Sequence, residues 1–222
     1  MQTKAVIFDL DDTLISSGID YKKAKSSVIS FLVESGVTDG LLSESMSNLE
    51  IINRAIEDLH GKNFTEAMIR RIIDRVYAMF NEAELRALER ARPMDGSMET
   101  LAALKDLGLR IGVVTNSCSA YARRVLKTFS LDKYIDVLFA RDEVPRHKPD
   151  PEHLLRALEA LGVHSSEAVF VGDHLIDALC ARDSGVKFIL LRNKKWYLRD
   201  AEKNAFAVIN HLSELPALLQ RI

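Results

Sequence analysis

Three carboxylates stand close together near the N-terminus, directly after an apolar run. Asp9, Asp11 and Asp12 fall in the segment VIFDLDDTL, at the exit of a strand expected from its apolar residues. Carboxylates this close repel one another, so a stable fold keeps them together only with a cation, a bound proton or lysine and arginine partners. The pattern therefore predicts a cation site, and an acidic turn after a buried strand is the plainer alternative.

Two polar segments further along the chain are candidates for the same site. Thr115, Asn116 and Ser117 follow the apolar run LRIGVV. A hydroxyl and backbone N–H groups at such a place can hold phosphate oxygens, although Thr and Ser after a strand also cap helices. Lys148 lies in RHKPDP, where the prolines stiffen the loop. A fixed ammonium group suits a site of crowded carboxylates and phosphate, while a solvent-exposed loop lysine is the alternative.

A third segment, GDHLID, carries two more carboxylates after the apolar run AVFV. Asp173 begins the loop and Asp177 follows about one helical turn later, so both can face the same point. Oxygen ligands in this arrangement suit magnesium. The alternative is that Asp173 caps the following helix and that its charge interacts with the helix dipole. We interpret His174 as a loop neighbour of these residues rather than as a catalytic group.

The elements that must position these residues follow from the hydrophobic periodicity. Residues 4–10 form a nearly continuous apolar run that predicts a strand buried on both faces, and residues 21–91 show helical periodicity alone. After residue 93, strands and helices alternate, which indicates a doubly wound parallel sheet. Ligands bind at the carboxyl ends of such strands, where all the candidate residues fall. Strands are expected at 110–115, 135–140, 168–171, 187–191 and 206–209, with helices at 98–107, 120–129, 152–161, 176–183 and 212–219.

Composition excludes several classes of protein. The 222 residues are 47% hydrophobic, which suits one domain of substantial core or a core with a smaller insert, and the net charge of -2 favours neither a nucleic acid nor a membrane surface. Lys194, Lys195 and Trp196 could contact an anion, but a solvated loop is the favoured interpretation. The two cysteines lack metal-ligand spacing and predict buried thiols in a reducing compartment. No apolar run approaches the roughly 20 residues of a membrane span, so we expect a cytoplasmic protein.

Taken in order, DLDDT, the Thr of VVTNS, the Lys of HKPDP and GDHLID resemble the four motifs of the haloacid dehalogenase superfamily. The resemblance covers the whole chain and implies an α/β fold. Its core is a Rossmann-like, three-layer α/β/α unit with a parallel sheet, expected from residues 1–14 and 93–222. A small all-helical cap domain of the C1 type is expected at residues 15–92, inserted after the first strand. Phosphoglycolate-phosphatase-like members have this organisation.

The resemblance also implies a function and a set of roles. The expected activity is a magnesium-dependent phosphatase that hydrolyses a small phosphorylated metabolite, a phosphate monoester, through an aspartyl-phosphate intermediate. Asp9 would be the nucleophile, and Asp11 would be the general acid and base. Thr115 and the backbone N–H of Asn116 would bind the transferring phosphoryl group. Lys148 would offset negative charge on Asp9 and on the phosphate.

The implied magnesium ligands are carboxylates and one backbone carbonyl. Mg²⁺ would be held by the side chains of Asp9 and Asp173 and by the backbone carbonyl of Asp11, with Asp177 ordering a metal-bound water or Lys148. Asp12 stands where many members of the superfamily carry glycine, though aspartate is also frequent there. We assign Asp12 no catalytic role.

Two other functions remain as alternatives. A phosphomutase of the β-phosphoglucomutase kind shares every core residue and differs in how the cap excludes water from the intermediate. A phosphate-binding regulatory protein without turnover is disfavoured by the intact set of motif residues. The dehalogenase branch of the superfamily typically lacks the carboxylate found here as Asp11. Residues 15–92 contain no recognisable substrate determinant, so phosphoglycolate, sugar phosphates, nucleotides and pyrophosphate all remain open, and the sequence predicts no oligomeric state.

Overall fold

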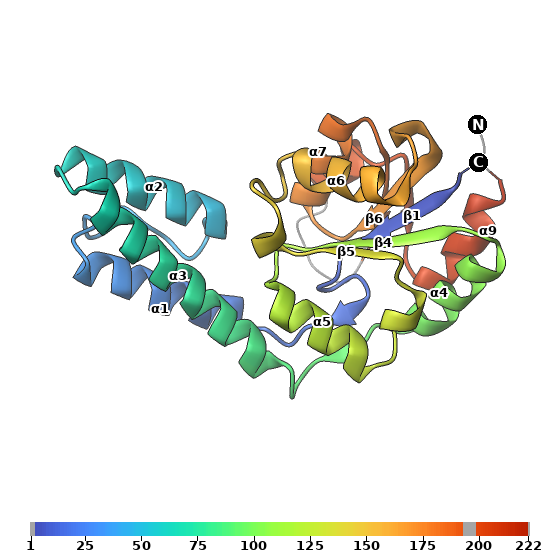
Figure 1. Ribbon diagram of the computed structural model, residues 1–222, viewed down its shortest axis with the longest axis horizontal. Coiled ribbons are helices and arrows are strands. Elements are labelled where there is room, and N and C mark those ends of the chain that lie inside the picture. The colour runs from blue at the N-terminus through green and yellow to red at the C-terminus, as the bar shows by residue number, and fades with distance from the viewer. Residues whose placement is uncertain (1–2, 193–198, 222) are drawn as a thin grey trace. The chain divides into compact units, whose positions relative to one another are not determined.

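The computed structural model describes residues 3–192 and 199–221. The chain divides into two compact units, the larger made of residues 1–17 and 90–222 and the smaller of residues 18–89 (Figure 1). The smaller unit lies within the segment 15–92 for which a cap domain is expected. Lys194, Lys195 and Trp196, considered above as an anion contact, lie outside the described residues.

A parallel sheet of six strands forms the centre of the larger unit, in the order β5-β4-β1-β6-β7-β8. The central strand β1 is completely buried, as its continuous apolar run predicts, and its Ile7 pairs in register with Gly112 and Phe170. A Cβ atom on Gly112 would lie 3.2 to 3.3 Å from neighbouring side chains, so only a glycine fits comfortably here. The strands are β1 (Ala5–Phe8), β4 (Arg110–Val114), β5 (Val137–Phe139), β6 (Ala168–Gly172), β7 (Lys187–Leu191) and β8 (Ala207–Ile209).

Helices cover both faces of this sheet. Figure 1 shows α6 (Glu152–Leu161) and α7 (Leu175–Ser184) on one face, with α4 (Ser97–Asp106) and α5 (Ser119–Thr128) on the other. The short helix α8 (Arg199–Lys203) contacts α7, and α9 (Leu215–Leu219) contacts α4. The apolar stripes of α6 and α7 pack on alternate residues of the strands in one buried core. The predicted three-layer α/β fold is confirmed.

The strand order places β1 at a topological switch point. From β1 the chain continues to β4 and β5 on one side and later to β6 on the other side. In parallel sheets the loops that follow such neighbouring strands diverge and leave a crevice at their carboxyl ends. The loops after β1, β4 and β6 therefore start from adjacent strand ends.

Some elements were not predicted. A two-stranded antiparallel pair joins β2 (Ile15–Ser16) to β3 (Arg92–Pro93), with Ile15 opposite Pro93. Two residues carry too little periodicity for a sequence pattern to reveal such strands. The helix α8 was also missed, and the helix expected at 212–219 begins with a 3₁₀ turn, Leu212–Glu214, before α9.

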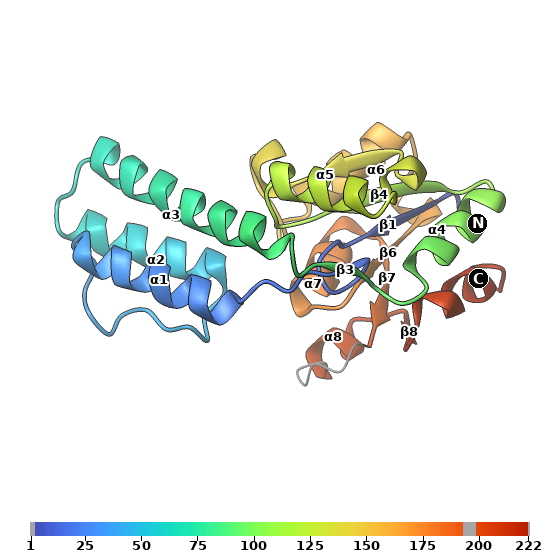
Figure 2. The same ribbon diagram turned by 90° about the horizontal axis from the view of Figure 1, so that it is seen from below.

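The smaller unit contains three helices that pack on a core of their own, α1 (Tyr21–Glu34), α2 (Asn48–Gly61) and α3 (Glu66–Ala87) (Figure 2). Leu32, Ile52 and Val76 are among the buried residues that the helical stripes place at this core. Thr65 is the N-cap of α3, because its side chain accepts a hydrogen bond from the backbone N–H of Met68 at 3.3 Å.

Two further expectations from the sequence concern the cysteines and membrane-spanning helices. Cys118 and Cys180 are buried free thiols, as predicted. Within residues 3–192 and 199–221, every helix is too short or too polar to span a membrane.

Candidate active site

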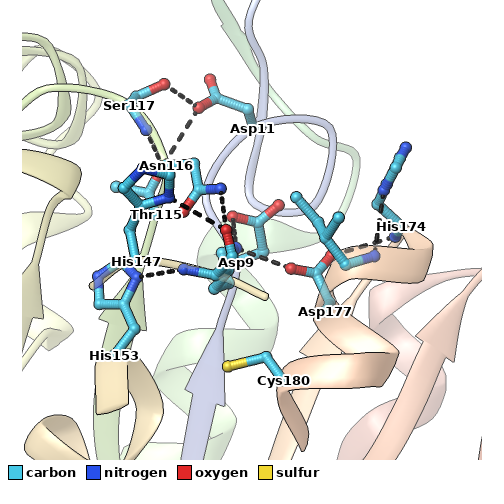
Figure 3. Close-up of polar contacts among 12 residues, drawn as sticks. Asp9, Asp11, Thr115, Asn116, Ser117, His147, His153, His174, Asp177 and Cys180 are labelled. Carbon is cyan, nitrogen blue, oxygen red and sulfur yellow. Dashed lines mark hydrogen bonds and ion pairs between the residues drawn. The ribbon is translucent and has the colours of Figure 1, made fainter. Parts of the chain in front are cut away.

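The candidate residues from all four motifs lie at the carboxyl ends of the parallel strands. Asp9 follows β1, Thr115 follows β4, and Lys148 lies in the loop between β5 and α6. Asp173 follows β6, and Asp177 lies in the first turn of α7. Figure 3 shows the side chains of Asp9, Thr115 and Asp177 close together at the strand ends.

Lys148 is the buried centre of this group. Its side chain is 1% exposed, and Nζ donates hydrogen bonds to Oδ1 of Asp9 and to Oδ1 of Asp177, each at 2.7 Å. The alternative of a solvent-exposed loop lysine is therefore wrong. Burial alone would lower the pKa of Lys148, but the carboxylates of Asp177 and Asp9 raise that pKa above its ordinary value. The lysine remains a cation in a place where water cannot solvate it.

Three carboxylates surround a point that suits a hard cation. Ligand oxygens of Asp9, Asp173 and Asp177 all lie within 4.8 Å of one another. Burial raises the pKa of Asp9 well above its ordinary value against the opposing charge of Lys148, and the charges of Asp177 and Asp173 add to the rise. One ammonium group cannot neutralise three carboxylates, so this all-oxygen set fits a divalent cation.

The local chain geometry explains why a glycine precedes Asp173. A Cβ atom on Gly172 would lie 2.6 Å from Oδ2 of Asp177, closer than side-chain contacts allow. That oxygen also accepts a hydrogen bond from the backbone N–H of His174 at 3.1 Å. His174 is itself the N-cap of α7, since its Nδ1 accepts from the N–H of Ile176 at 3.3 Å. The alternative that Asp173 caps this helix is wrong.

The carboxylate of Asp11 lies in a separate set of contacts, formed by hydroxyl groups. Ser117 Oγ donates to Oδ2 at 2.6 Å, Tyr121 OH donates to Oδ1 at 3.0 Å, and Thr115 Oγ1 makes a longer contact to Oδ2 at 3.4 Å. Ser117 and Tyr121 are buried. In Figure 3 the carboxylate of Asp11 points toward Ser117. The sequence placed Ser117 in a segment that binds phosphate or caps a helix and did not predict its contact with Asp11, and it missed Tyr121, because a tyrosine within the next helix carries no signal.

The neighbours Asn116 and Asp12 have different surroundings. The side-chain amide of Asn116 donates to the backbone carbonyl of Lys148 at 2.8 Å, a contact that the sequence did not suggest. Asp12 has a φ of 60°, in the left-handed region that favours glycine and tolerates aspartate. This conformation explains a preference for glycine at the position, and it lets the backbone N–H of Asp12 donate to the carbonyl of Ile15 at 2.6 Å.

Comparison with known proteins identifies the family of this chain. Residues 6–191 match the sequence pattern of the family described as haloacid dehalogenase-like hydrolase. The chain belongs to the haloacid dehalogenase-like hydrolases. It is therefore an enzyme of the hydrolase class, and the predicted family is confirmed.

Individual members of the family resemble the chain along most of its length. A phosphoglycolate phosphatase of Cupriavidus necator is 31% identical, over 97% of this chain and 92% of the relative. An N-acetylmuramic acid 6-phosphate phosphatase of Pseudomonas aeruginosa is 29% identical, over 100% of this chain and 96% of the relative. The crystal structure of a haloacid dehalogenase-superfamily hydrolase of subfamily IA from Geobacter sulfurreducens has a TM-score of 0.61 and 26% identity, and covers 98% of this chain and 96% of its own.

Proposed function

We propose that this hydrolase is a magnesium-dependent phosphatase that cleaves a small phosphate monoester through an aspartyl-phosphate intermediate. The observation that carries the proposal is the buried ammonium group of Lys148 bound to both Asp9 and Asp177, with Asp173 beside them. This arrangement keeps a carboxylate nucleophile next to positive charge, which the approach of a phosphate dianion requires. The two curated relatives are both named as phosphatases, which supports the same class of reaction.

In the first step, an oxygen of Asp9 attacks phosphorus, and the bond from phosphorus to the ester oxygen breaks. Asp11 donates a proton to the departing alkoxide. In the second step, Asp11 takes a proton from water, and the water oxygen attacks the aspartyl-phosphate, which releases inorganic phosphate and restores Asp9. Two carboxylates two positions apart thus divide the work of nucleophile and of acid and base.

The remaining motif residues hold the phosphoryl group and its charge. We assign Thr115 and the backbone N–H of Asn116 to binding the phosphoryl oxygens. Lys148 would offset the negative charge of Asp9 and of the phosphate. Asp9, Asp173 and the backbone carbonyl of Asp11 would hold Mg²⁺, with Asp177 holding Lys148. Magnesium, when bound, supplies further positive charge to the phosphoryl oxygens.

We propose that the helical unit of residues 18–89 serves as the cap that selects the substrate. The two curated relatives are named for different phosphate monoesters, so the substrate class is taken only as small phosphorylated metabolites. The free buried thiols of Cys118 and Cys180 favour a reducing compartment, and we propose the cytoplasm.

The test is hydrolysis of a generic aryl phosphate with and without Mg²⁺. We expect activity that excess chelator abolishes and that Asp9→Asn removes, while Asp12→Gly, which suits the left-handed backbone, serves as the matched control and retains activity. Undiminished turnover in Asp9→Asn or in chelator would overturn the proposal. Incubation with sugar phosphates should release phosphate, whereas formation of an isomer would favour a phosphomutase.

A further inference from the structure

His153 is a buried histidine in the first turn of α6 whose two ring nitrogens both have backbone partners. The side chain is 0% exposed. Nδ1 contacts the backbone N of Lys148 at 3.2 Å, and Nε2 contacts the backbone carbonyl oxygen of Phe139 at 3.0 Å. A backbone N–H can only donate and a carbonyl can only accept, so these contacts require a neutral ring with its proton on Nε2.

The carbonyl of Phe139 connects this histidine to a second motif. The same oxygen accepts the backbone N–H of Thr115 at 3.0 Å, at the point where β5 ends beside β4. One carbonyl group therefore receives hydrogen bonds from Thr115 and from His153. Through the imidazole ring, the backbone of Lys148 is tied to the backbone position of Thr115.

The opposite end of the Lys148 residue is held as well. Its carbonyl oxygen accepts the side-chain amide of Asn116 at 2.8 Å and is 3.1 Å from Nδ1 of His147. The backbone of Lys148 is thus fixed on its N–H side by His153 and on its carbonyl side by Asn116. These contacts fix the backbone position from which the side chain of Lys148 extends toward Asp9.

We propose that His153 is a positioning residue that sets the place of Lys148 relative to Asp9 and Thr115, by accepting the backbone N–H of Lys148 and donating to the carbonyl of Phe139. The proposal rests on the proposed function, in which Lys148 serves the nucleophile. An apolar side chain could fill the same space, but it would leave the N–H of Lys148 without this acceptor in a buried loop. Burial and the charge of Lys148 lower the pKa of His153 to about 3, which keeps the ring neutral at physiological pH.

Three substitutions separate the two hydrogen bonds. His153→Asn keeps an acceptor close to the position of Nδ1, His153→Gln keeps a donor close to the position of Nε2, and His153→Leu keeps neither. We expect kcat for an aryl phosphate to fall by about 10-fold or more in the Gln and Leu variants, since small displacements of catalytic groups have effects of this size. The Asn variant should stay within about 3-fold of the unmodified enzyme by the same argument.

A purely structural role would give a different result. Leu158→Ala, a substitution of another buried residue on α6, serves as the control that lowers thermal stability while leaving the hydrogen bonds of His153 in place. Its kcat should be unchanged at a temperature where it is folded. Equal kcat in the Asn, Gln and Leu variants, measured under the same conditions, would overturn the positioning role while leaving the proposed phosphatase activity intact.

A measurement on the unmodified protein tests the geometry without any activity. The ¹⁵N chemical shifts of the His153 ring should show a protonated Nε2 and an unprotonated Nδ1 at pH 7. A protonated Nδ1 could not accept from Lys148 and would overturn the inference. If the protein hydrolysed no phosphate ester, the proposed function would fail, yet this measurement would still decide how His153 is bound.

Discussion

The phenolic oxygen of Tyr121 donates a hydrogen bond to Oδ1 of Asp11 at 3.0 Å, from a ring that is completely buried. Ser117 donates to the other oxygen of the same carboxylate at 2.6 Å. The proposed acid and base is therefore oriented by hydroxyl groups from the segment after β4, while the proposed nucleophile is held by Lys148. Asp9 and Asp11, which are two positions apart in the sequence, are therefore held by different residues.

Tyr121→Phe tests the support of Asp11. The variant keeps the buried ring and removes the donor, so we expect kcat to fall by about 10-fold with little change in KM, because a misplaced acid affects proton transfer more than binding. Loss of one hydrogen bond to a carboxylate should lower the free energy of unfolding by about 1.5–3 kcal/mol. Steady-state kinetics and urea unfolding measure both quantities, and an unchanged kcat would contradict the role.

Gly172→Ala tests the contact between Gly172 and Asp177. The added Cβ would stand 2.6 Å from a carboxylate oxygen that must stay within reach of Lys148, so we expect Asp177 to move, activity to fall and stability to drop by about 1–3 kcal/mol. Gly61→Ala is the matched control, because a Cβ there meets nothing within 4 Å and the glycine lies at the end of α2. The control should leave activity unchanged, and equal behaviour of the two variants would refute the explanation.

Asp173→Asn tests the metal site. The carboxylate belongs to the acidic group, while Asp9 and Asp177 hold the ammonium group of Lys148, so loss of the Asp173 charge should weaken the affinity for Mg²⁺ more than it disturbs the fold. We expect the Mg²⁺ concentration for half-maximal activity to rise by about 10-fold or more, as loss of a ligand charge would cause. Isothermal titration with Mg²⁺ alone gives an independent readout, and an unchanged dissociation constant would remove Asp173 from the ligands.

The neutral His153 predicts a pH dependence of stability. Its pKa in the folded protein is lowered to about 3 from 6.5, by burial first and then by the charges of Lys148 and His147. Below pH 6.5 the unfolded chain therefore binds a proton that the folded protein does not. The contribution of this residue is present above pH 6.5 and is lost as the pH falls toward 3, by about 1.4 kcal/mol per pH unit.

Urea unfolding at several pH values between 7 and 4 measures this effect. We expect His153→Leu to show a shallower fall of unfolding free energy with decreasing pH than the unmodified protein, since the titrating group is gone. The difference between the slopes of the two curves against pH should correspond to about one bound proton. Parallel curves would mean that His153 is charged in the folded protein and would contradict its buried, neutral state.

The sequence by itself determined the order of the elements, the parallel sheet and the loops that carry the site. Alternating strands and helices after residue 93 permit few arrangements, and every parallel strand delivers its loop to the same edge of the sheet. Asp9, Thr115, Lys148 and Asp173 could therefore be placed together in advance, since each follows a strand.

Only the tertiary structure decided which of these groups touch and what holds them. Lys148 binds Asp9 across a sequence separation of 139 residues, and Tyr121 binds Asp11 across 110. Such contacts depend on the neighbours that the strand order gives to β1, which periodicity does not encode. His153 shows the same limit, because a histidine in a helical stripe gives no sign of its backbone partners until β5 and the Lys148 loop are packed around it.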